Sequence, residues 1–452
     1  MLFLLACAAE SVPRVLSGAG YEEVVFDTLA VGIDPDDVLG VTVAGIPAYD
    51  LRTTGSGKLG LWVQGGPAGI YDVRVETQAD SATVAGAIEY LPPVDPVFER
   101  TVAIGASITM GFQDAASGAR AQLASPPAIL AQTVGAWMPL PLLEDDLWAT
   151  IQLEDIGEPP GCEIPNLGSL VLGSFLDSLT SMLDPETGEY NFRLARKTPD
   201  VVPHNVAIGG YLLNTILEGA SANNPVYSIL TYLTLQNDRT MIGDDTGLST
   251  LERLEALEPT LVISADLYGN DILSAAISSG GIAWDLVTPP EALRADLTLV
   301  VERLAATGAE VFLGNLPRLD RLPSAVQQHH DPVEMAALLE VLDEYNAALA
   351  EEAARWPNVH VVDQYQYVED NLDGLTTDHF SLTMGPLGGL ISYDGVHFSD
   401  TGNALVAELF IESIEEELGL ELPEVDLVNT LLGDLHSPLV LEVYGISGGD
   451  CD

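Results

Sequence analysis

Three residues of this 452-residue chain have the types and the spacing that serine-based acyl transfer needs. Ser107 follows an apolar run that ends at Gly105, which places its hydroxyl at the carboxyl end of a predicted strand, where open α/β sheets carry their ligand sites. Asp394 stands three residues before His397, so its carboxylate can turn back to the imidazole Nδ1–H and leave Nε2 free as a base. A serine hydroxyl needs such a base to become a nucleophile. The spacing therefore predicts a nucleophile, its base and an orienting carboxylate.

Two further segments could supply hydrogen-bond donors to the same site. Gly210 ends the segment His204–Gly210, where backbone without a Cβ atom can approach a ligand closely and donate its N–H. Asn270 follows another apolar segment, and its amide suits an oxyanion hole, a set of donors that stabilises negative charge on a reacting carbonyl oxygen. Each residue alone is more often a turn or cap residue, whereas the joint pattern at four strand or loop ends is far more specific.

The elements that must position these residues alternate along the chain from residue 98 onward. Strand–helix alternation implies a parallel sheet that is covered by helices on both faces. One helical segment has its own boundary signals, with Ser125 at the cap, proline in the first turn and Gly135 at the stop. The predicted strands are 101–105, 204–208, 260–266, 310–316 and 358–363, and the predicted helices are 125–135, 291–307, 332–355 and 402–418.

Residues 12 to about 92 have a different pattern, in which glycines separate short alternating segments. In one of them Tyr71, Val73 and Val75 share one face and the intervening polar side chains share the other, which is the period of a half-buried strand. Several short strands at this spacing predict a small all-β sandwich. The predicted strands are 41–45, 59–63, 71–76 and 82–86.

In this order the four chemistry-bearing segments resemble the SGNH hydrolases, also called GDSL esterases and lipases, over about 98–420. Gly105-Ala-Ser-Ile108 is similar to the block that carries the family's nucleophile, and Asp394-Gly-Val-His397 is similar to the final block. Two positions depart from the family pattern. Ala106 stands where the family often has aspartate, and Tyr268 stands where it often has glycine, so the loop around Tyr268 is expected to differ locally.

The resemblance implies a three-layer α/β/α domain that hydrolyses carboxylic acyl esters without a cofactor. Ser107 would attack the carbonyl carbon, His397 would take the serine proton, and Asp394 would orient the imidazole. The backbone N–H groups of Ser107 and Gly210 and the Asn270 amide would form the oxyanion hole. The chain has no Cys and His spacing typical of a zinc site, so no metal is expected.

The segment between the nucleophile and the glycine block bears on the substrate. Residues 113–200 form an insert that is rich in leucine and proline and longer than the family usually has. Long inserts are often lids, and an apolar lid fits a lipophilic ester, whereas a plain packing extension is an equal alternative. An acyltransferase or a carbohydrate O-acetyl esterase at the cell surface would need the same residues. A non-catalytic surface binding protein with a degenerate hydrolase fold is disfavoured because the residue set is complete.

Two resemblances concern the chain before this domain. Residues 10–92 resemble the immunoglobulin-like IPT/TIG domains, through Val41–Ala48, Gly66–Val75 and Ala87–Tyr90, and such a module could contact a polysaccharide or a surface. Leu4-Leu-Ala-Cys7 resembles the lipobox of bacterial lipoproteins. That resemblance implies that Cys7 is lipidated and that the protein is exported and held at a membrane by this lipid alone, whereas an untethered terminus is the alternative.

Export would also bear on the two remaining cysteines. Cys162 and Cys451 could then form a disulfide, and two unpaired thiols are the equal alternative. The predicted organisation is a lipoprotein remnant at 1–9, a β-sandwich at 10–92, a proline-rich linker at 93–97, the hydrolase domain at 98–420 with its insert at 113–200, and a C-terminal extension at 421–452, which could hold a short helix and the strand 439–443.

The charge of the chain excludes one class of partner. Acidic residues number 68 against 16 basic ones, which gives a formal net charge of −52. Such a field repels phosphate backbones, so we expect no nucleic-acid binding. The acidic side chains are spread over the sequence, which fits either general solubility or a high-salt environment in which screening relieves the self-repulsion.

Overall fold

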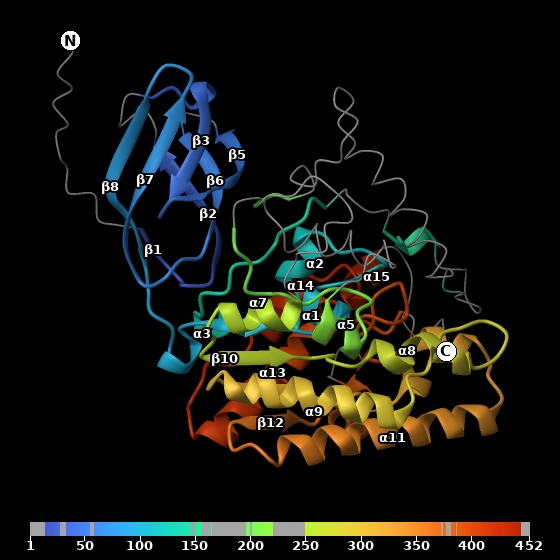
Figure 1. Ribbon diagram of the computed structural model, residues 1–452. Helices are drawn as coiled ribbons and strands as arrows, with labels where there is room; N and C mark the ends of the chain where they lie inside the picture. Colours follow the sequence, from blue (N-terminus) through green and yellow to red (C-terminus); the bar gives the residue numbers. More distant parts are fainter. Residues whose placement is uncertain are drawn as a thin grey trace, which may run out of the picture.

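The computed structural model has an all-β part followed by a part in which helices surround a parallel sheet (Figure 1). The described residues are 14–27, 33–54, 58–145, 150–155, 164, 196–198, 201–219, 249–371, 374–376, 381–385 and 387–443. Among them, no helix is both long enough and apolar enough to span a lipid bilayer.

The N-terminal part packs two sheets face to face, as the alternating pattern predicts. Tyr71, Val73 and Val75 lie on β7, where the two valines are buried and the polar side chains between them are exposed. The core between the sheets also takes Leu61 from β6 and Ile88 from β8. One sheet has the order β1 (Arg14–Leu16), β8 (Ser81–Tyr90), β7 (Gly69–Thr77), β3 (Val38–Val43) and β4 (Ile46–Pro47), and the other has the order β2 (Gly20–Asp27), β6 (Lys58–Gln64) and β5 (Tyr49–Thr54).

Four parallel strands form the sheet of the second part, at the places that the sequence predicts. Their spatial order is β12 (Val359–Val362), β11 (Glu310–Gly314), β10 (Leu261–Ser264) and β9 (Thr101–Ala103). The prediction of a strand at 204–208 is wrong in extent, because only Asn205 pairs with Ala103, in a single parallel bridge. Beyond this bridge one further backbone hydrogen bond joins the two segments, from the Ile208 N–H to the Gly105 carbonyl at 3.2 Å. The Asn205 side chain accepts from the Ala207 N–H and donates to the Thr109 carbonyl.

The order of these segments in the sheet determines where a ligand can bind. We number the five paired segments along the chain, with β9 first and the Asn205 segment second. Their order across the sheet is then 2-1-3-4-5, so the direction of chain winding reverses between β9 and β10. Helix-connected sheets open a crevice at the carboxyl ends of the strands at this switch point. The segments that follow β9 and β10 carry Ser107 and Asn270, respectively.

Helices cover both faces of the sheet (Figure 1). Side chains alternate along β10, so Val262 packs with the helices α9 (Pro290–Ala306) and α11 (Pro332–Ala353), whereas Leu261 and Ile263 pack with α3 (Pro126–Val134) and α13 (Asp400–Leu418). These four helices match the predicted ones to within about two residues at most ends. Ser125 does stand at the start of α3, but its hydroxyl donates to the Gln122 carbonyl instead of capping the helix.

The remaining elements are short. The strand predicted at 439–443 is wrong, because these residues belong to helix α15. Pro438 is its first residue, and the Ser437 hydroxyl accepts a hydrogen bond from the Leu439 N–H, which satisfies the helix start. The other helices are α1 (Ser107–Met110), α2 (Ala119–Leu123), α5 (Leu213–Glu218), α7 (Thr250–Ala256), α8 (Asn270–Ala276), α10 (Pro323–Gln327), α12 (Gln364–Asp370) and α14 (Leu427–Gly433), and the hairpin strands are β13 (Leu375–Thr376) and β14 (Ser381–Leu382).

Candidate active site

Ser107 is the first residue of α1, immediately after the turn that leaves β9. The turn depends on Gly105, whose φ of +151° is rarely adopted by other residues. A Cβ atom at this position would lie 2.7 Å from the Thr109 hydroxyl and 2.8 Å from Asp266 Oδ1. The turn therefore needs glycine for both its backbone angle and its space, and it brings the Ser107 side chain to the switch point.

Asp266 binds the other side of the same turn. Its Oδ1 atom accepts hydrogen bonds from the Ala106 N–H (3.0 Å), the Thr109 N–H (3.2 Å) and the Thr109 hydroxyl (2.6 Å). Its Oδ2 atom accepts one from the Ile108 N–H at 2.7 Å. The carboxylate, which lies two residues beyond β10, thus binds the N–H groups on either side of Ser107 and satisfies the start of α1.

The predicted triad residues meet with hydrogen-bonding geometry. His397 Nε2 lies 2.8 Å from Ser107 Oγ, and His397 Nδ1 lies 2.7 Å from Asp394 Oδ2. All three side chains are buried, with Asp394 fully inaccessible. Because a carboxylate accepts at Nδ1, the neutral imidazole carries its proton there and presents Nε2 to the serine hydroxyl as an acceptor.

The loop that carries Asp394 and His397 is folded around the Asp394 carboxylate. Its Oδ1 atom accepts from the N–H groups of Val396 and His397, each at 2.9 Å, and its Oδ2 atom accepts from the Ala115 N–H at 2.9 Å. Burial alone would raise the pKa of Asp394, but His397 and these backbone donors lower it to about 2. Burial alone would lower the pKa of His397, but Asp394 raises it above the usual histidine value.

A partly open cavity lies over the Ser107 and His397 side chains and encloses about 510 Å³ of space, including the part that is open to solvent. We call it the catalytic cavity. Asn270 lines it, whereas Gly210 (φ +82°) is not among the described residues that do so. The two donor segments are nevertheless joined, since Asn270 Nδ2 donates to the Tyr211 carbonyl at 3.1 Å. Most of the remaining lining is apolar, from Ile108, Leu273, Leu316, Leu319, Leu322, Val396 and Phe398.

The family model described as GDSL-like Lipase/Acylhydrolase matches residues 102–410. The chain belongs to this family. It is accordingly a GDSL-type hydrolase of carboxylic esters, and the α/β/α expectation is confirmed. The match begins on β9 and ends within α13, so it includes Ser107, Asn270, Asp394 and His397.

Solved structures add only weak similarity. The chain is similar to an acetyl xylan esterase, AlAXEase, at 13% identity and a TM-score of 0.27, covering 46% of this chain and 79% of that one. It is also similar to a carbohydrate acetylesterase from Xanthomonas citri, at 12% identity and a TM-score of 0.29, covering 91% and 75%. An α/β hydrolase enzyme from the metagenome of Lake Arreo, Spain, gives 13% identity and a TM-score of 0.31, covering 70% and 94%. No curated protein matches the chain significantly.

Sequence reasoning missed two buried acidic groups of this site. Asp266 was predicted only as the end of a strand, although an acidic residue two positions after a fully buried strand is a signal for a carboxylate with a specific role. The second is Asp114, whose Oδ1 atom lies 2.8 Å from Nε2 of His436 in the C-terminal segment. Nothing local in the sequence relates residues that are more than three hundred positions apart.

Several predicted features fall outside the residues that the structure describes. Cys7, Cys162 and Cys451 are outside the described residues, and so is about half of the insert at 113–200. Within the described part of the chain, no group of three or more His, Cys, Asp or Glu side chains could hold a metal ion.

Proposed function

We propose that the Ser107, His397 and Asp394 side chains form the catalytic triad of this ester hydrolase. The observation that carries the proposal is the continuous contact from Asp394 through His397 to Ser107 Oγ, with distances of 2.7 and 2.8 Å. His397 Nε2 accepts the hydroxyl proton as Ser107 Oγ bonds to the carbonyl carbon, and the imidazolium then returns the proton to the leaving alcohol. Water, activated by the same imidazole, releases the acid and restores the serine.

The charge that develops on the carbonyl oxygen needs donors near Ser107. We assign this role to the Ser107 and Gly210 backbone N–H groups and the Asn270 amide. The position of Ser107 at the start of α1 supports the first, because the N–H groups of a helix start have no partner within the helix. The lining of the catalytic cavity by Asn270, beside Ser107, supports the last.

The apolar lining of the catalytic cavity supports an ester with a hydrocarbon acyl group. A carbohydrate O-acetyl ester would place the same carbonyl over Ser107, and an acyltransferase would pass the acyl group to an alcohol instead of water.

Outside the active site we propose an exported protein that is held at a membrane through a lipidated Cys7. We propose that its residues 10–92 form an IPT/TIG-like module that approaches a surface. The all-β fold of residues 14–90 supports the module.

The proposal is tested by labelling the full chain with a fluorophosphonate and mapping the adduct by mass spectrometry, alongside hydrolysis of p-nitrophenyl acetate. We expect the label on Ser107, and we expect Ser107→Ala to abolish labelling and hydrolysis while the melting temperature stays unchanged. Ser278→Ala is the matched control, because Ser278 lies just after α8 and its hydroxyl bonds the backbone carbonyls of Ala275 and Gly281. Wild-type hydrolysis by Ser107→Ala would overturn the assignment.

A further inference from the structure

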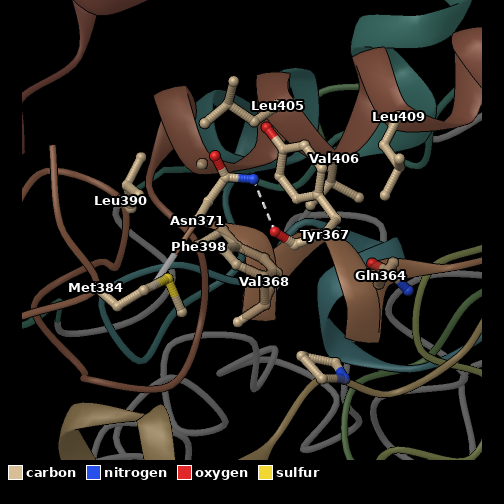
Figure 2. A pocket seen from close by; sticks show the side chains of 12 residues that line it. Gln364, Tyr367, Val368, Asn371, Met384, Leu390, Phe398, Leu405, Val406 and Leu409 are labelled. Carbon is tan, nitrogen blue, oxygen red and sulfur yellow. Dashed lines mark hydrogen bonds between the residues drawn. The ribbon is translucent and has the colours of Figure 1, made fainter. Parts of the chain in front are cut away.

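A second cavity, whose lining Figure 2 shows, shares two lining residues with the catalytic cavity. It encloses about 530 Å³ of space, including the part that is open to solvent. Pro317 and Phe398 line both cavities, and Phe398 directly follows His397. We call it the distal cavity; its other lining includes Tyr367 and Val368 on α12, Leu405 and Leu409 on α13, and Met384 and Leu390 from the loop before Asp394.

The distal cavity offers little to a polar ligand. The Asn371 amide nitrogen donates to the Tyr367 carbonyl at 2.8 Å, as Figure 2 shows. The Gln364 amide nitrogen donates to the carbonyls of Ala265 and Asn315 at 2.8 and 3.0 Å. These donors are thus engaged by the backbone, and the remaining wall is mainly hydrocarbon, which favours a ligand that binds by burial of apolar surface.

We infer that the distal cavity binds the far end of a medium-length hydrocarbon acyl chain whose carbonyl lies over Ser107. The inference rests on the proposed function and specifies its substrate class. Its basis is the shared lining, because a chain that passes over the Pro317 and Phe398 side chains extends from the catalytic cavity to the distal cavity. A short acetyl group would leave the distal cavity empty, so acetyl esters gain nothing from it.

The test narrows the distal cavity with larger side chains and compares the hydrolysis of esters with acyl chains of different length. Leu405→Trp and Val368→Trp act from two walls, on α13 and α12. Leu299→Trp is the matched control, because Leu299 is exposed on α9. Since one methylene in an apolar pocket changes kcat/KM about tenfold or more, each cavity variant should lose at least about tenfold on p-nitrophenyl decanoate and nothing on p-nitrophenyl acetate.

The outcomes separate this inference from the proposed function. An equal loss on both esters, no loss on the decanoate, or a wild-type enzyme that hydrolyses only the acetate would overturn the distal cavity as a chain site. Ser107-dependent acetate hydrolysis would still support the triad in each case. Hydrolysis that survives Ser107→Ala would overturn the triad itself.

A second inference rests on a separate observation, the contact between the C-terminal segment and the loop after α1. His436 is 1% exposed and lies between two carboxylates, with Nε2 2.8 Å from Asp114 Oδ1 and Nδ1 2.9 Å from Asp434 Oδ1. Asp434 Oδ2 in turn accepts from the Thr401 N–H and hydroxyl at 2.8 and 2.6 Å, at the start of α13. Burial alone would lower the pKa of His436, but the two carboxylates raise it to about 10, so the imidazole is a cation at neutral pH.

Asp114 connects this ion cluster to the triad. Asp114 and Ala115 have φ values of +53° and +65°, a conformation that non-glycine residues adopt only when neighbours hold it. The Tyr393 N–H donates to Asp114 Oδ1 at 2.9 Å, and the Ala115 N–H donates to Asp394 Oδ2 at 2.9 Å. The geometry points to His436 as a positioning residue that acts on Asp394 through Asp114 and Ala115.

The test reads the acidic limb of the pH profile of kcat/KM, which reports the protonation of His397. Asp394, Asp266 and Asp114 face His397, whereas Asp114, Asp434 and, farther off, Asp400 face His436. Asp400 is paired with Arg120 at 2.9 Å. His436→Gln leaves the Asp114 anion unpaired, which should raise the pKa of His397 and move the limb to higher pH. Asp114→Asn removes that anion and should move the limb to lower pH.

Opposite shifts are the signature of this arrangement, since a merely structural role would lower activity without moving the limb in two directions. We also expect kcat to fall more than KM rises in His436→Gln. His360→Gln is the matched control, because His360 also lies between two carboxylates, Glu310 and Glu417, but on β12 at the edge of the sheet. If His436→Gln does not fold, the pH profile of kcat/KM for Asp114→Asn tests the inference by itself. An unmoved limb, or shifts in one direction for both variants, would overturn the inference.

Discussion

The Oδ2 atom of Asp266 accepts the Ile108 N–H at 2.7 Å, so a carboxylate from the end of β10 holds the turn that carries Ser107 at the end of β9. Hydrogen bonds thereby join two chain segments that are more than one hundred and fifty residues apart. The nucleophile is positioned by this contact across the switch point as well as by its own strand.

Asp266→Asn tests that contact. An amide has one acceptor atom where the carboxylate has two, and its NH₂ group would face backbone N–H donors. We expect the free energy of unfolding to fall by about 1–3 kcal/mol, because buried donors lose their acceptor, and we expect kcat to fall with it. Thr109→Val, which removes only the Thr109 hydroxyl, should cost less in both. Chemical denaturation and ester hydrolysis measure the two effects, and an unaltered Asp266→Asn enzyme would contradict this role.

Gly105→Ala should disable the enzyme through its backbone. The new Cβ would lie 2.7–2.8 Å from three side-chain oxygen atoms, of Thr109, Asp266 and Ser264, at a φ that alanine avoids. We expect a large loss of kcat/KM and a lower melting temperature. Gly308→Ala is the control, since its φ is +78° and no atom lies within 4 Å of the added carbon. That variant should lose only about 1 kcal/mol of stability and no activity. Equal activity in the two variants would show that the turn tolerates the extra carbon.

Asn270→Ala should lower turnover by about 10²–10³-fold, the usual effect of losing one oxyanion donor. The same change removes the hydrogen bond to the Tyr211 carbonyl, so a stability measurement must accompany the kinetics. Asn315→Ala is the control, because the Asn315 amide donates to Asp363 at 2.7 Å and is absent from the lining of the catalytic cavity. A turnover that drops equally in both variants would remove Asn270 from the oxyanion hole.

The pH dependence follows from the His397 and Asp394 pair. His397 acts as a base only when neutral, and Asp394 raises its pKa above the usual histidine value. Activity should therefore fall as the pH drops through that raised pKa, and Asp394→Asn should shift the limb to lower pH because the stabilising anion is gone. We also expect kcat to fall by about 10⁴-fold in Asp394→Asn, because the imidazole loses its tautomer and orientation. A pH profile of kcat/KM for both proteins measures the shift, and an identical limb would contradict the pairing.

Much of the fold was predictable because its signals are local. The four parallel strands are short segments in which apolar residues predominate, and helices such as α3 begin with proline and end at glycine. Composition and boundary residues therefore identify each element without its neighbours. The segment at 204–208 and the tail at 439–443 were assigned to strands from their apolar residues. The first forms only the single bridge from Asn205 to Ala103, and in the second a Ser437 cap with Pro438 favoured a helix.

The sequence by itself determined which residues could do chemistry here: Ser107 after an apolar strand, and Asp394 three residues before His397, since that spacing lets the loop close on itself. Only the tertiary structure decided what holds them. The Asp266 carboxylate under the Ser107 turn, the His436 cation behind Asp114, and the distal cavity beside Phe398 all join segments distant along the chain. Such contacts depend on the order of strands in the sheet and on helix packing, and no local pattern of residue types encodes them.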